Sequence, residues 1–574
     1  MRAVARQGDK QICDEQTIIW FLTVFFIISL VMTGGYTQWS AALLSLSSGV
    51  MLTLVIIKSG KVMIGRGICA VTIPAVTLMY LVTALWAADR GMALEGFFHF
   101  LPLFLFYALM NRVTDEKERL IRLLPVCGSL MTIFSFLMMQ FSVFRDYVSV
   151  ANRLAGFFQY PNTYALFMLI CLIVASDHLT QGPVDWLDMA HCAIAAFGIF
   201  MSGSRTTFLL LLAVLLLFAV RSKNLRRFLL PLAAAALLLV ALLGITGVTG
   251  DLFGRLLDVS FRSSTFLGRL LYAQDSLRLI LAHPFGCGYY GYYFLQGEVQ
   301  TGVYSVVNVH NELLQMMLDI GILPALLFYG TLLAAVCKKC IPGRDRLTIL
   351  VLMLHSLLDY DFQFLSILFV LILFLNQQNG KGYPVSMFTK VIAVGGTAAA
   401  AAGAVCIGSS DLLMMSGRYE ASVWAYNGNT LAKTYLLTEL EDVDELSELA
   451  VSITKSNSHV PLAYHAMAQA ALVEGKISDY IDYKETALQL SPYDFDSYTD
   501  YLDGLSYCFS LYLESGETES AEICYQRVQN VQELLEQVKE KTSWLGWQID
   551  DAPQVTLPEE YQEMIVSMGE QLES

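Results

Sequence analysis

The sequence predicts an all-α polytopic membrane protein of about 12–13 transmembrane helices, followed by a soluble α-helical domain. Two observations predict the membrane part: hydrophobic residues make up 55% of the chain and charged residues only 15%, and apolar runs of 15–25 residues recur between Thr17 and Gly408. A third observation separates the tail, because from Asp411 onward about 30 acidic residues face 8 basic ones.

Each apolar run is long enough, or nearly so, to cross a hydrocarbon core of about 30 Å. The predicted spans are 17–33, 40–57, 68–86, 93–110, 120–143, 162–178, 186–201, 206–220, 228–248, 312–337, 347–359, 363–376 and 388–408. The first run lacks a small-residue cleavage site, so we expect a retained helix and not a removed signal peptide.

The positions of Lys and Arg predict the orientation. With the N-terminus in the cytoplasm, the positive-inside rule is met by four basic loops, Lys58–Arg66, Arg112–Arg122, Arg221–Arg227 and Lys338–Arg346. The polar segments 144–161, 202–205, 249–311 and 360–361 then lie outside. We therefore predict a multi-pass protein of the plasma or inner membrane, with a transmembrane domain (1–410) that carries a large extracytoplasmic loop (249–311) and an extracytoplasmic acidic domain (411–574).

The acidic tail shows apolar periodicity near 3.6 and is predicted to be helical. Its acidity argues against nucleic acid or anionic lipid head groups as its partners. The stretch His459–Tyr493 has the length of a tetratricopeptide repeat: Tyr464, Ala468, Ala487 and Pro492 fit that pattern, whereas Tyr480 and Lys484 depart from it. Such a domain binds a protein partner or packs on its own membrane domain, and a plain helical cap is the simpler alternative.

The cysteines predict no metal site. Cys337 and Cys340 form one CxxC pair, but no second pair completes a zinc site. A disulfide between Cys508 and Cys524, both in the predicted exported tail, stays open.

Three arginines in the predicted outer segments are candidates for binding an anion. Arg205, in SGSRTTF at the outer end of a span, can hold phosphate oxygens through two donors, although an arginine there also commonly snorkels to the interface. Arg153 and Arg269 lie in the other outer loops and taken singly are surface charges. Together the three have the chemistry to clamp a pyrophosphate.

Two histidines lie in the loop 249–311. His310 and Asn311 open a helix whose free N–H groups suit an anionic ligand, and His310 can accept a proton near neutral pH. Capping of that helix is the simpler role. His283 precedes Pro284 and a glycine-rich turn, so its simpler role is to shape that turn.

Farther along, LHSLLDYDF places His355 and Asp359 four residues apart. On a helix this spacing predicts a hydrogen-bonded pair that supports a cavity wall or contacts a sugar. Asn162, just after Pro161, is a candidate N-cap that can also face the cavity.

The series NRLAGFFQYPN, GSRTTF, GRLLY, HPFGCGYYG, HNELLQMMLDIG and HSLLDYDF, spread over residues 150–376, resembles the O-antigen ligase and polysaccharide polymerase superfamily. The tail resembles the helical-repeat extensions of some members. The resemblance implies a GT-C-type glycosyltransferase fold with an extracytoplasmic cavity and a polyprenyl-pyrophosphate-linked glycan as donor, with neither metal nor nucleotide as cofactor.

The resemblance also implies roles for individual residues. Arg205 and Arg269 would bind the pyrophosphate leaving group, and His310 would activate the acceptor hydroxyl. Arg153, Tyr272, Asn162 and Asp359 would line the cavity.

Three functions fit this pattern. A ligase passes the glycan once to a glycan, lipid or protein acceptor, whereas a polymerase transfers a growing chain onto another lipid-linked unit. A transporter or assembly scaffold would place charges at mid-span and break helices with Gly or Pro. The polar clusters lie at the outer ends of the spans, which favours an enzyme, and the choice between ligase and polymerase stays open.

Overall fold

The computed structural model describes residues 2–181, 185–221, 263–375 and 378–573 of the chain. Helices dominate this part, and two short two-stranded sheets accompany them. The largest core is formed by apolar side chains of α1–α5, α7–α9 and α14–α17, whose bounds follow. Residues 222–262, which include the predicted span 228–248 and the start of the loop 249–311, lie outside the described residues.

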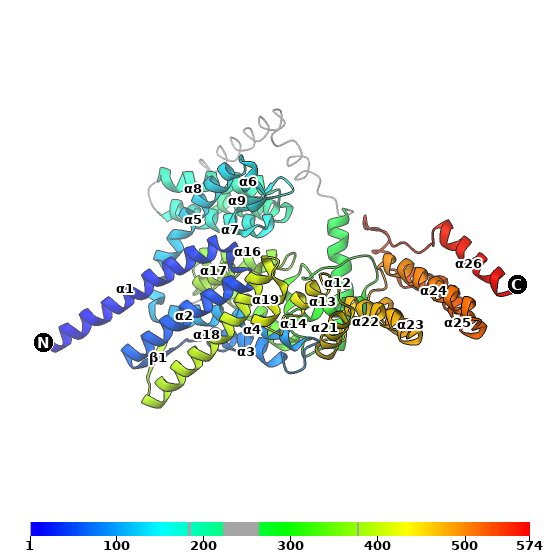
Figure 1. The fold of residues 1–574 in the computed structure, drawn as a ribbon. Coiled ribbons are helices and arrows are strands. Elements are labelled where there is room, and N and C mark those ends of the chain that lie inside the picture. The colour runs from blue at the N-terminus through cyan, green and yellow to red at the C-terminus, as the bar shows by residue number, and fades with distance from the viewer. Residues whose placement is uncertain (1, 182–184, 222–262, 376–377, 574) are drawn as a thin grey trace.

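The membrane part consists of two groups of helices, which Figure 1 shows one above the other. The first group comprises α1 (Arg2–Val31), α2 (Gln38–Ser59), α3 (Cys69–Thr83), α4 (Arg90–Val113), α15 (Ile322–Cys337), α17 (Leu365–Leu375) and α18 (Met387–Met415). The second group comprises α5 (Lys117–Met138), α7 (Pro161–Gln181), α8 (Trp186–Ser202) and α9 (Arg205–Arg221), and the short helix α6 (Ser142–Val148) follows α5. Helix α16 (Gly343–Ser356) contacts both groups, packing on α15 and α17 and on α7 and α9.

Four stretches are long and apolar enough to cross a membrane: Gln38–Ser59, Arg90–Met138, Pro161–Thr180 and Met387–Met415. Six shorter apolar helices accompany them among the described residues. The all-α polytopic class predicted from the sequence is therefore confirmed.

The predicted span 312–337 is divided in the structure. Helix α14 (Glu312–Ile320) ends at Gly321, and α15 begins at the next residue. Gly321 has φ 92°, and a side chain there would lie 2.8 Å from the backbone of Phe285, so only glycine fits this close approach. Helix α14 buries the polar residues Glu312, Gln315 and Asp319, and its apolar side chains share a core with the segment 263–299 that precedes it.

The outer loop itself is helical where it is described. Helix α12 (Ser264–Ala282) ends at a turn through Gly286, and α13 (Gly291–Val299) follows it. The two helices and α14 share a small apolar core that includes Leu279, Tyr292 and Leu318. This core gives the loop a defined shape, on which the site described below depends.

Two of the four predicted basic loops, 58–66 and 112–122, meet at one end of the first helix group, and residues 222–227 of a third lie outside the described residues. Strand β1 (Lys61–Ile64) pairs antiparallel with β4 (Lys381–Pro384), with Lys61 opposite Pro384. Arg112 donates to Ser59 Oγ at 2.8 Å. The loops 58–66 and 112–122 and the segment before α18 therefore lie together, as expected for one membrane face.

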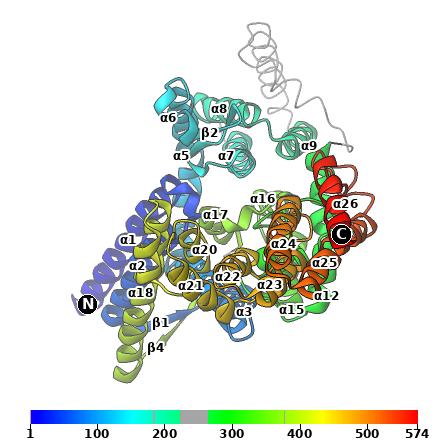
Figure 2. The same ribbon diagram turned by 45° about the vertical axis from the view of Figure 1, so that its right-hand side comes forward.

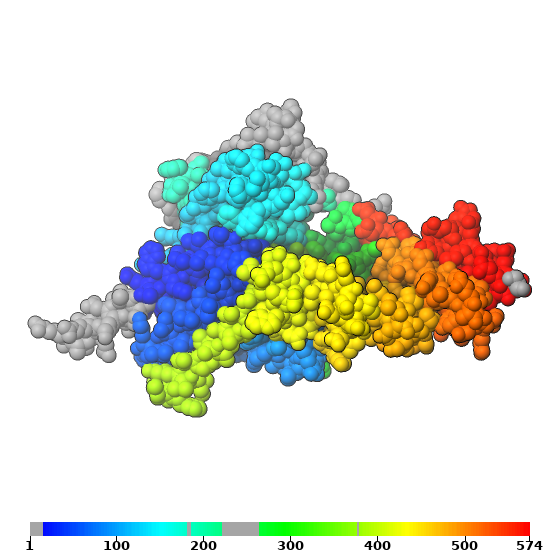
Figure 3. Space-filling view, in the orientation of Figure 1, coloured from blue at the N-terminus to red at the C-terminus, as the bar shows by residue number. Residues whose placement is uncertain are grey.

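The tail is a chain of antiparallel helices. Its elements are α19 (Tyr419–Ala425), α20 (Thr430–Leu437), α21 (Val443–Ser456), α22 (Pro461–Val473), α23 (Ile477–Leu490), α24 (Phe495–Ser515), α25 (Thr518–Lys541) and α26 (Glu559–Glu573). Each helix from α19 to α25 packs on the next, and Figures 2 and 3 show them running in sequence away from the end of α18. Cys508 and Cys524 are both free and lie in the same core, formed mainly by α23–α25.

Asp89 anchors the tail to the membrane part. Its carboxylate caps α4 by accepting from Met92 N at 3.0 Å, and it also accepts from Thr430 Oγ1 at 2.5 Å and from Asn457 Nδ2 at 3.1 Å. Asp89 is only 1% exposed. Around it, Met92 of α4 and Phe294 of α13 share an apolar core with α20–α22 of the tail.

We expect Asp89→Ala to loosen the tail from the membrane part. The substitution removes an N-cap, which contributes about 1 kcal/mol to stability, and it leaves Thr430 and Asn457 without their hydrogen-bond acceptor. We therefore expect the free energy of unfolding to fall by about 2–4 kcal/mol in total. Trypsin cleavage at the exposed Arg418 of the purified protein, together with its thermal unfolding, measures the effect.

Asp442→Ala is the matched control, because Asp442 caps α21 by bonds within the tail alone. It should lower stability without speeding cleavage at Arg418. Equal cleavage rates in the wild type and in Asp89→Ala would show that Asp89 does not anchor the tail.

Candidate active site

A buried carboxylate, Asp359, lies at the centre of the candidate site. It follows the end of α16 and is 1% exposed. One oxygen, Oδ1, accepts hydrogen bonds from Tyr160 Oη at 2.7 Å and from its neighbour Tyr360 N at 3.1 Å, and it lies 3.2 Å from His310 Nδ1. The other, Oδ2, accepts from Asn162 Nδ2 at 2.7 Å and from Arg269 Nη2 at 3.2 Å. These partners come from segments that are far apart in the chain, so Asp359 joins them.

Arg269 reaches Asp359 from the second turn of α12. Its Nη1 donates to Leu358 O at 2.7 Å, and its Nη2 donates to Asp359. Among the described residues, its buried Nε has no hydrogen-bond acceptor. A buried guanidinium donor without a partner leaves one position at which a ligand oxygen can bind.

Arg153 and Asn162 extend the cluster toward α8. A tight turn with positive φ at Ala151 and Asn152 joins the two-residue strands β2 (Ser149–Val150) and β3 (Arg153–Leu154) and sets the position of Arg153. Arg153 donates to Ser202 O at the end of α8 and to Asn162 Oδ1, both at 2.7 Å. Asn162 lies in the first turn of α7, and its side chain joins Arg153 to Asp359, whereas its sequence position suggested a helix cap.

His310 lies in the left-handed backbone region, with φ 56°, directly before the N-cap of α14. This conformation is uncommon for a residue with a Cβ, and histidine tolerates it better than most. The ring packs edge-on against Tyr360, with centroids 4.9 Å apart, and its side chain is 22% exposed. Because the carboxylate of Asp359 can only accept, Nδ1 carries the proton and Nε2 is left as an acceptor.

His355 pairs with Asp361 and not with Asp359. Helix α16 ends at Ser356, so the helical spacing behind the expected pair does not extend to Asp359. His355 Nδ1 lies 2.6 Å from Asp361 Oδ2, and its Nε2 lies 2.9 Å from Thr207 Oγ1 of α9. All three side chains are fully buried, so they brace the inner wall of the site.

The other predicted residues occupy different positions. Arg205 is the first residue of α9 and donates to Ser263 Oγ, the N-cap residue of α12, at 3.4 Å. Ser263 precedes Arg269 by six residues, or about 9 Å along the helix. Asn311 caps α14, accepting from Leu314 N at 3.1 Å. His283 is the C-cap of α12, about 21 Å along that helix from Arg269.

A pocket of about 350 Å³ opens beside the cluster. Arg269 and Tyr272 of α12 line it together with His310 and the loop 303–306. The tail completes its wall with Ile549 and Asp551. We name this cavity the Arg269 pocket; its volume is in the range of small-ligand sites.

The charges around Asp359 hold it ionised. Burial alone would raise the pKa of its carboxyl, but the Arg269 guanidinium and the hydrogen bond from His310 outweigh burial and hold the pKa of Asp359 well below its usual range. The site therefore contains a fixed negative charge between a guanidinium and an imidazole. Among the described residues, no group of three or more His, Cys, Asp or Glu side chains is arranged to hold a metal ion.

The fold and this cluster define a polytopic helical membrane protein with an arginine- and histidine-containing site beside the segment 263–311. Residues 190–329 match the family model of the O-antigen ligase domain, so the resemblance to the O-antigen ligase superfamily is confirmed. No curated protein and no solved structure matches the chain. The matched segment contains Arg205, Arg269 and His310 but ends before Asp359 and the tail, so the tetratricopeptide-like character of the tail stays a prediction.

Several contributors to the site were missed by the sequence analysis. Tyr160 donates to Asp359, Asp361 holds His355, and the ring of Tyr304 packs against that of Tyr272 in a tilted arrangement, with centroids 4.7 Å apart. Tyr160 and Asp361 are each two positions from a predicted residue, Asn162 and Asp359, but only the fold shows which of these neighbours turn inward. The tail residues of the pocket wall have no signal in the sequence.

We expect Asp359→Asn to destabilise the protein in a pH-dependent way. Removing the carboxylate leaves a buried guanidinium without its charge partner, which costs about 3 kcal/mol at pH 7. Because the pKa of Asp359 is lower in the folded protein than in the unfolded chain, the ionised carboxylate stabilises the fold at any pH above the unfolded pKa of about 3.9. This stabilisation is lost as the pH falls toward the folded-state pKa. The stability gap between wild type and Asp359→Asn should thus narrow between about pH 5 and pH 3.

Chemical unfolding in detergent micelles at several pH values measures this gap. Asp500→Asn serves as the control, because Asp500 is an exposed tail carboxylate whose partner, Lys484, lies within the tail. A gap for Asp359→Asn that stays constant down to pH 3 would contradict a buried, ionised Asp359.

Proposed function

We propose that this protein is a metal-independent glycosyltransferase that moves a glycan from a polyprenyl-pyrophosphate carrier, such as undecaprenyl pyrophosphate, to an acceptor. The O-antigen ligase match implies a membrane enzyme of the ligase or polymerase type in polysaccharide assembly. The donor, the acceptor and the residue roles are our proposal. The observation that carries it is the convergence of Arg269 and His310 on Asp359 beside one pocket.

In this proposal the acceptor hydroxyl oxygen attacks the anomeric carbon of the donor sugar. The bond from that carbon to the pyrophosphate oxygen breaks, and the carrier pyrophosphate leaves with the electron pair. The hydroxyl proton goes to His310 Nε2, because Nδ1 is held by Asp359. Asp359 sets the tautomer and stabilises the imidazolium that forms.

The arginines would stabilise the charge that develops on the leaving group. Arg269 has an unpartnered Nε beside the pocket, which favours a phosphate oxygen as its ligand. Arg205 lies near the start of α12 and would contact the pyrophosphate farther from the sugar. Arg153 orients Asn162 and so acts through Asp359.

The geometry also supports an extracytoplasmic site and tail. Helix α18 spans 29 residues, about 43 Å, between the strand β4 and the tail. The basic loops 58–66 and 112–122 gather at the β4 end, and the tail begins at the other end (Figure 1). With the basic end in the cytoplasm, the tail and the Arg269 pocket that it helps to line lie outside.

Two alternatives stay open within this proposal. A polymerase would use the same residues and take a lipid-linked repeat unit as acceptor, whereas a ligase would take a lipid core, a wall polymer or a protein side chain. A non-enzymatic transporter or scaffold, with the tail recruiting a protein partner, is the third. Arg269 favours an enzyme, because it lines a pocket together with His310.

The deciding experiment uses purified protein in proteoliposomes with a polyprenyl-pyrophosphate-linked oligosaccharide, without nucleotide and with a metal chelator. A ladder of longer lipid-linked chains would mean a polymerase, and one product that forms only with an added acceptor would mean a ligase. Activity that returns only when a divalent cation is added would contradict metal independence. Folded protein without turnover on any tested donor would favour the scaffold.

We expect Arg269→Lys to lower kcat/KM for transfer by about 100-fold, although the charge is kept. Lysine cannot donate at once to Leu358 O, Asp359 and a phosphate oxygen as the planar guanidinium can. Arg205→Lys should also lose most activity, if Arg205 contacts the pyrophosphate. Arg278→Lys on the same helix is the control. Near-normal transfer by both variants at wild-type protein levels would remove the phosphate-binding role.

We expect His310→Ala to lower kcat by about 10²–10⁴-fold while donor binding is kept, as for a group that acts on the acceptor hydroxyl. His310→Gln is the informative companion, since an amide can keep the hydrogen bond to Asp359 but cannot accept the proton. Transfer rates and donor binding are measured on the same preparations. Equal loss of donor binding and transfer would place His310 in the donor site instead.

A further inference from the structure

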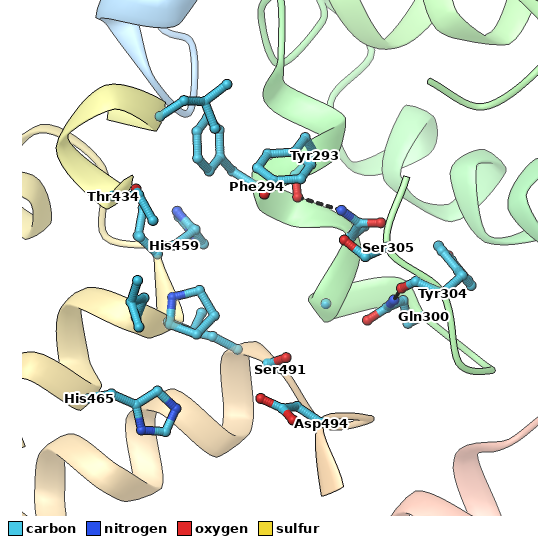
Figure 4. A pocket seen from close by; sticks show the side chains of 17 residues that line it. Tyr293, Phe294, Gln300, Tyr304, Ser305, Thr434, His459, His465, Ser491 and Asp494 are labelled. Atoms are coloured by element: carbon cyan, nitrogen blue, oxygen red, sulfur yellow. Dashed lines mark hydrogen bonds between the residues drawn. The ribbon is translucent and has the colours of Figure 1, made fainter. Parts of the chain in front are cut away.

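A second pocket, of about 300 Å³, lies between the outer loop and the tail. Figure 4 shows its two walls, with Tyr293 and Phe294 of α13 and the loop after it on one side, and His459, His465 and Ser491 of the tail on the other. We name it the interdomain pocket. Neither the family match nor the reaction proposed above assigns it a role.

The lining of the interdomain pocket combines aromatic faces with hydroxyl and amide groups. Tyr293, Phe294 and Tyr304 provide apolar ring surface, and Gln296, Gln300, Thr434, Ser305 and Ser491 provide polar atoms. Within the described part of the chain, the hydroxyls of Tyr293, Ser305 and Ser491 make no hydrogen bond with the protein. Polar groups that are not used internally can bind a polyhydroxylated ligand, whose C–H faces pack on the aromatic rings.

The charges of this pocket differ from those of the Arg269 pocket. None of the described residues that line the interdomain pocket is Lys or Arg, and Asp494 adds a carboxylate. His459 Nε2 lies 3.1 Å from Glu298 Oε1, so this side chain already has a partner. A pyrophosphate would find no cation among these residues, so the lining favours an uncharged ligand.

The two pockets share one wall. Tyr304 and Ser305 line both of them. This loop is held in place, because the buried carboxylate of Asp275 accepts hydrogen bonds from Thr301 N and Oγ1, at 2.9 and 2.8 Å, and from Tyr304 Oη at 3.0 Å. The two pockets therefore adjoin at this loop, and a glycan chain that extends past it from the interdomain pocket would reach Arg269 and His310.

We propose that the interdomain pocket binds the uncharged sugar units of the glycan, at a distance from the bond that reacts. This inference rests on the proposed function, because that function makes a glycan the expected ligand. The residues that support it are separate from those assigned to the reaction. The tail is then part of the substrate-binding surface and not only a support. It contributes Ser491 and Thr434 on the wall that faces Tyr293.

The test measures glycan binding directly, apart from transfer. The probe is the free oligosaccharide released by mild acid from the cell's own lipid-linked glycan, which has neither pyrophosphate nor lipid. Its Kd for the purified full-length protein in detergent is measured by calorimetry. We expect Ser491→Trp, which fills the pocket, to weaken binding by at least tenfold, and Tyr293→Phe, which removes one hydroxyl, to weaken it about fivefold.

Ser510→Trp is the matched control, because Ser510 is exposed on α24 outside both pockets. It should bind the probe as the wild type does. Thermal unfolding verifies that each variant is folded, and Tyr293→Ala replaces Ser491→Trp if the latter is not. Absence of binding by the wild type, or unchanged binding in both pocket variants, would overturn the inference.

Transfer assays on the same variants separate the two proposals. If the pocket holds the acceptor, Ser491→Trp raises the KM for long acceptors and leaves short ones unchanged; if it holds the donor chain, the KM for long donors rises instead. If Ser491→Trp keeps the wild-type KM at every chain length while Arg269→Lys loses transfer, glycan binding in the interdomain pocket is overturned and the proposed transferase function is kept. If the wild type binds the probe but transfers no glycan, and Ser491→Trp abolishes probe binding, glycan binding in the interdomain pocket is kept and the proposed transferase function is overturned.

Discussion

The buried negative charge of Asp359 is the constraint on which the candidate site depends. An isolated carboxylate in such a place would be strongly unfavourable, so it requires cationic and hydrogen-bonding partners. Those partners come from four separate segments: Tyr160 and Asn162 at the start of α7, Arg269 on α12, His310 before α14, and the backbone of Tyr360. Satisfying one charge thereby fixes where the outer loop lies against both helix groups. The same bonds hold His310 in the tautomer that can take up a proton.

The sequence predicted the all-α polytopic class, for a physical reason. Apolar runs must be helical in a bilayer, because the backbone has no other partners there. Arg269, His310 and Asp359 were candidates because the resemblance to the O-antigen ligase superfamily implied roles for them, and taken singly Arg269 was a surface charge and His310 a helix cap. What the sequence did not predict was their pairing. The helical spacing suggested that His355 contacts Asp359, but α16 ends at Ser356 and the partner of His355 is Asp361.

The division of the predicted span 312–337 has a similar origin. The segment is largely apolar, and the helix breaks at Gly321, where the chain approaches the backbone of Phe285. That break makes α14 a separate helix whose polar face is buried, with Gln363 donating to Glu312 at 2.8 Å. His310 and the N-cap Asn311 owe their positions to this short helix. Contacts between distant segments decide such features, and no local pattern records them.

The tail contacts the rest of the protein at several separate places. Asp89 holds α20 and the end of α21, α13 packs on α23, and Ile549 packs with Leu267 and Leu271 of α12, on either side of Arg269. Ser543 N also donates to Thr301 O at 2.9 Å, next to the loop that separates the two pockets. Removing the tail would therefore take one wall from both pockets and a support from α12. A domain attached so closely to the helix that carries Arg269 is expected to affect substrate binding and not only partner recruitment.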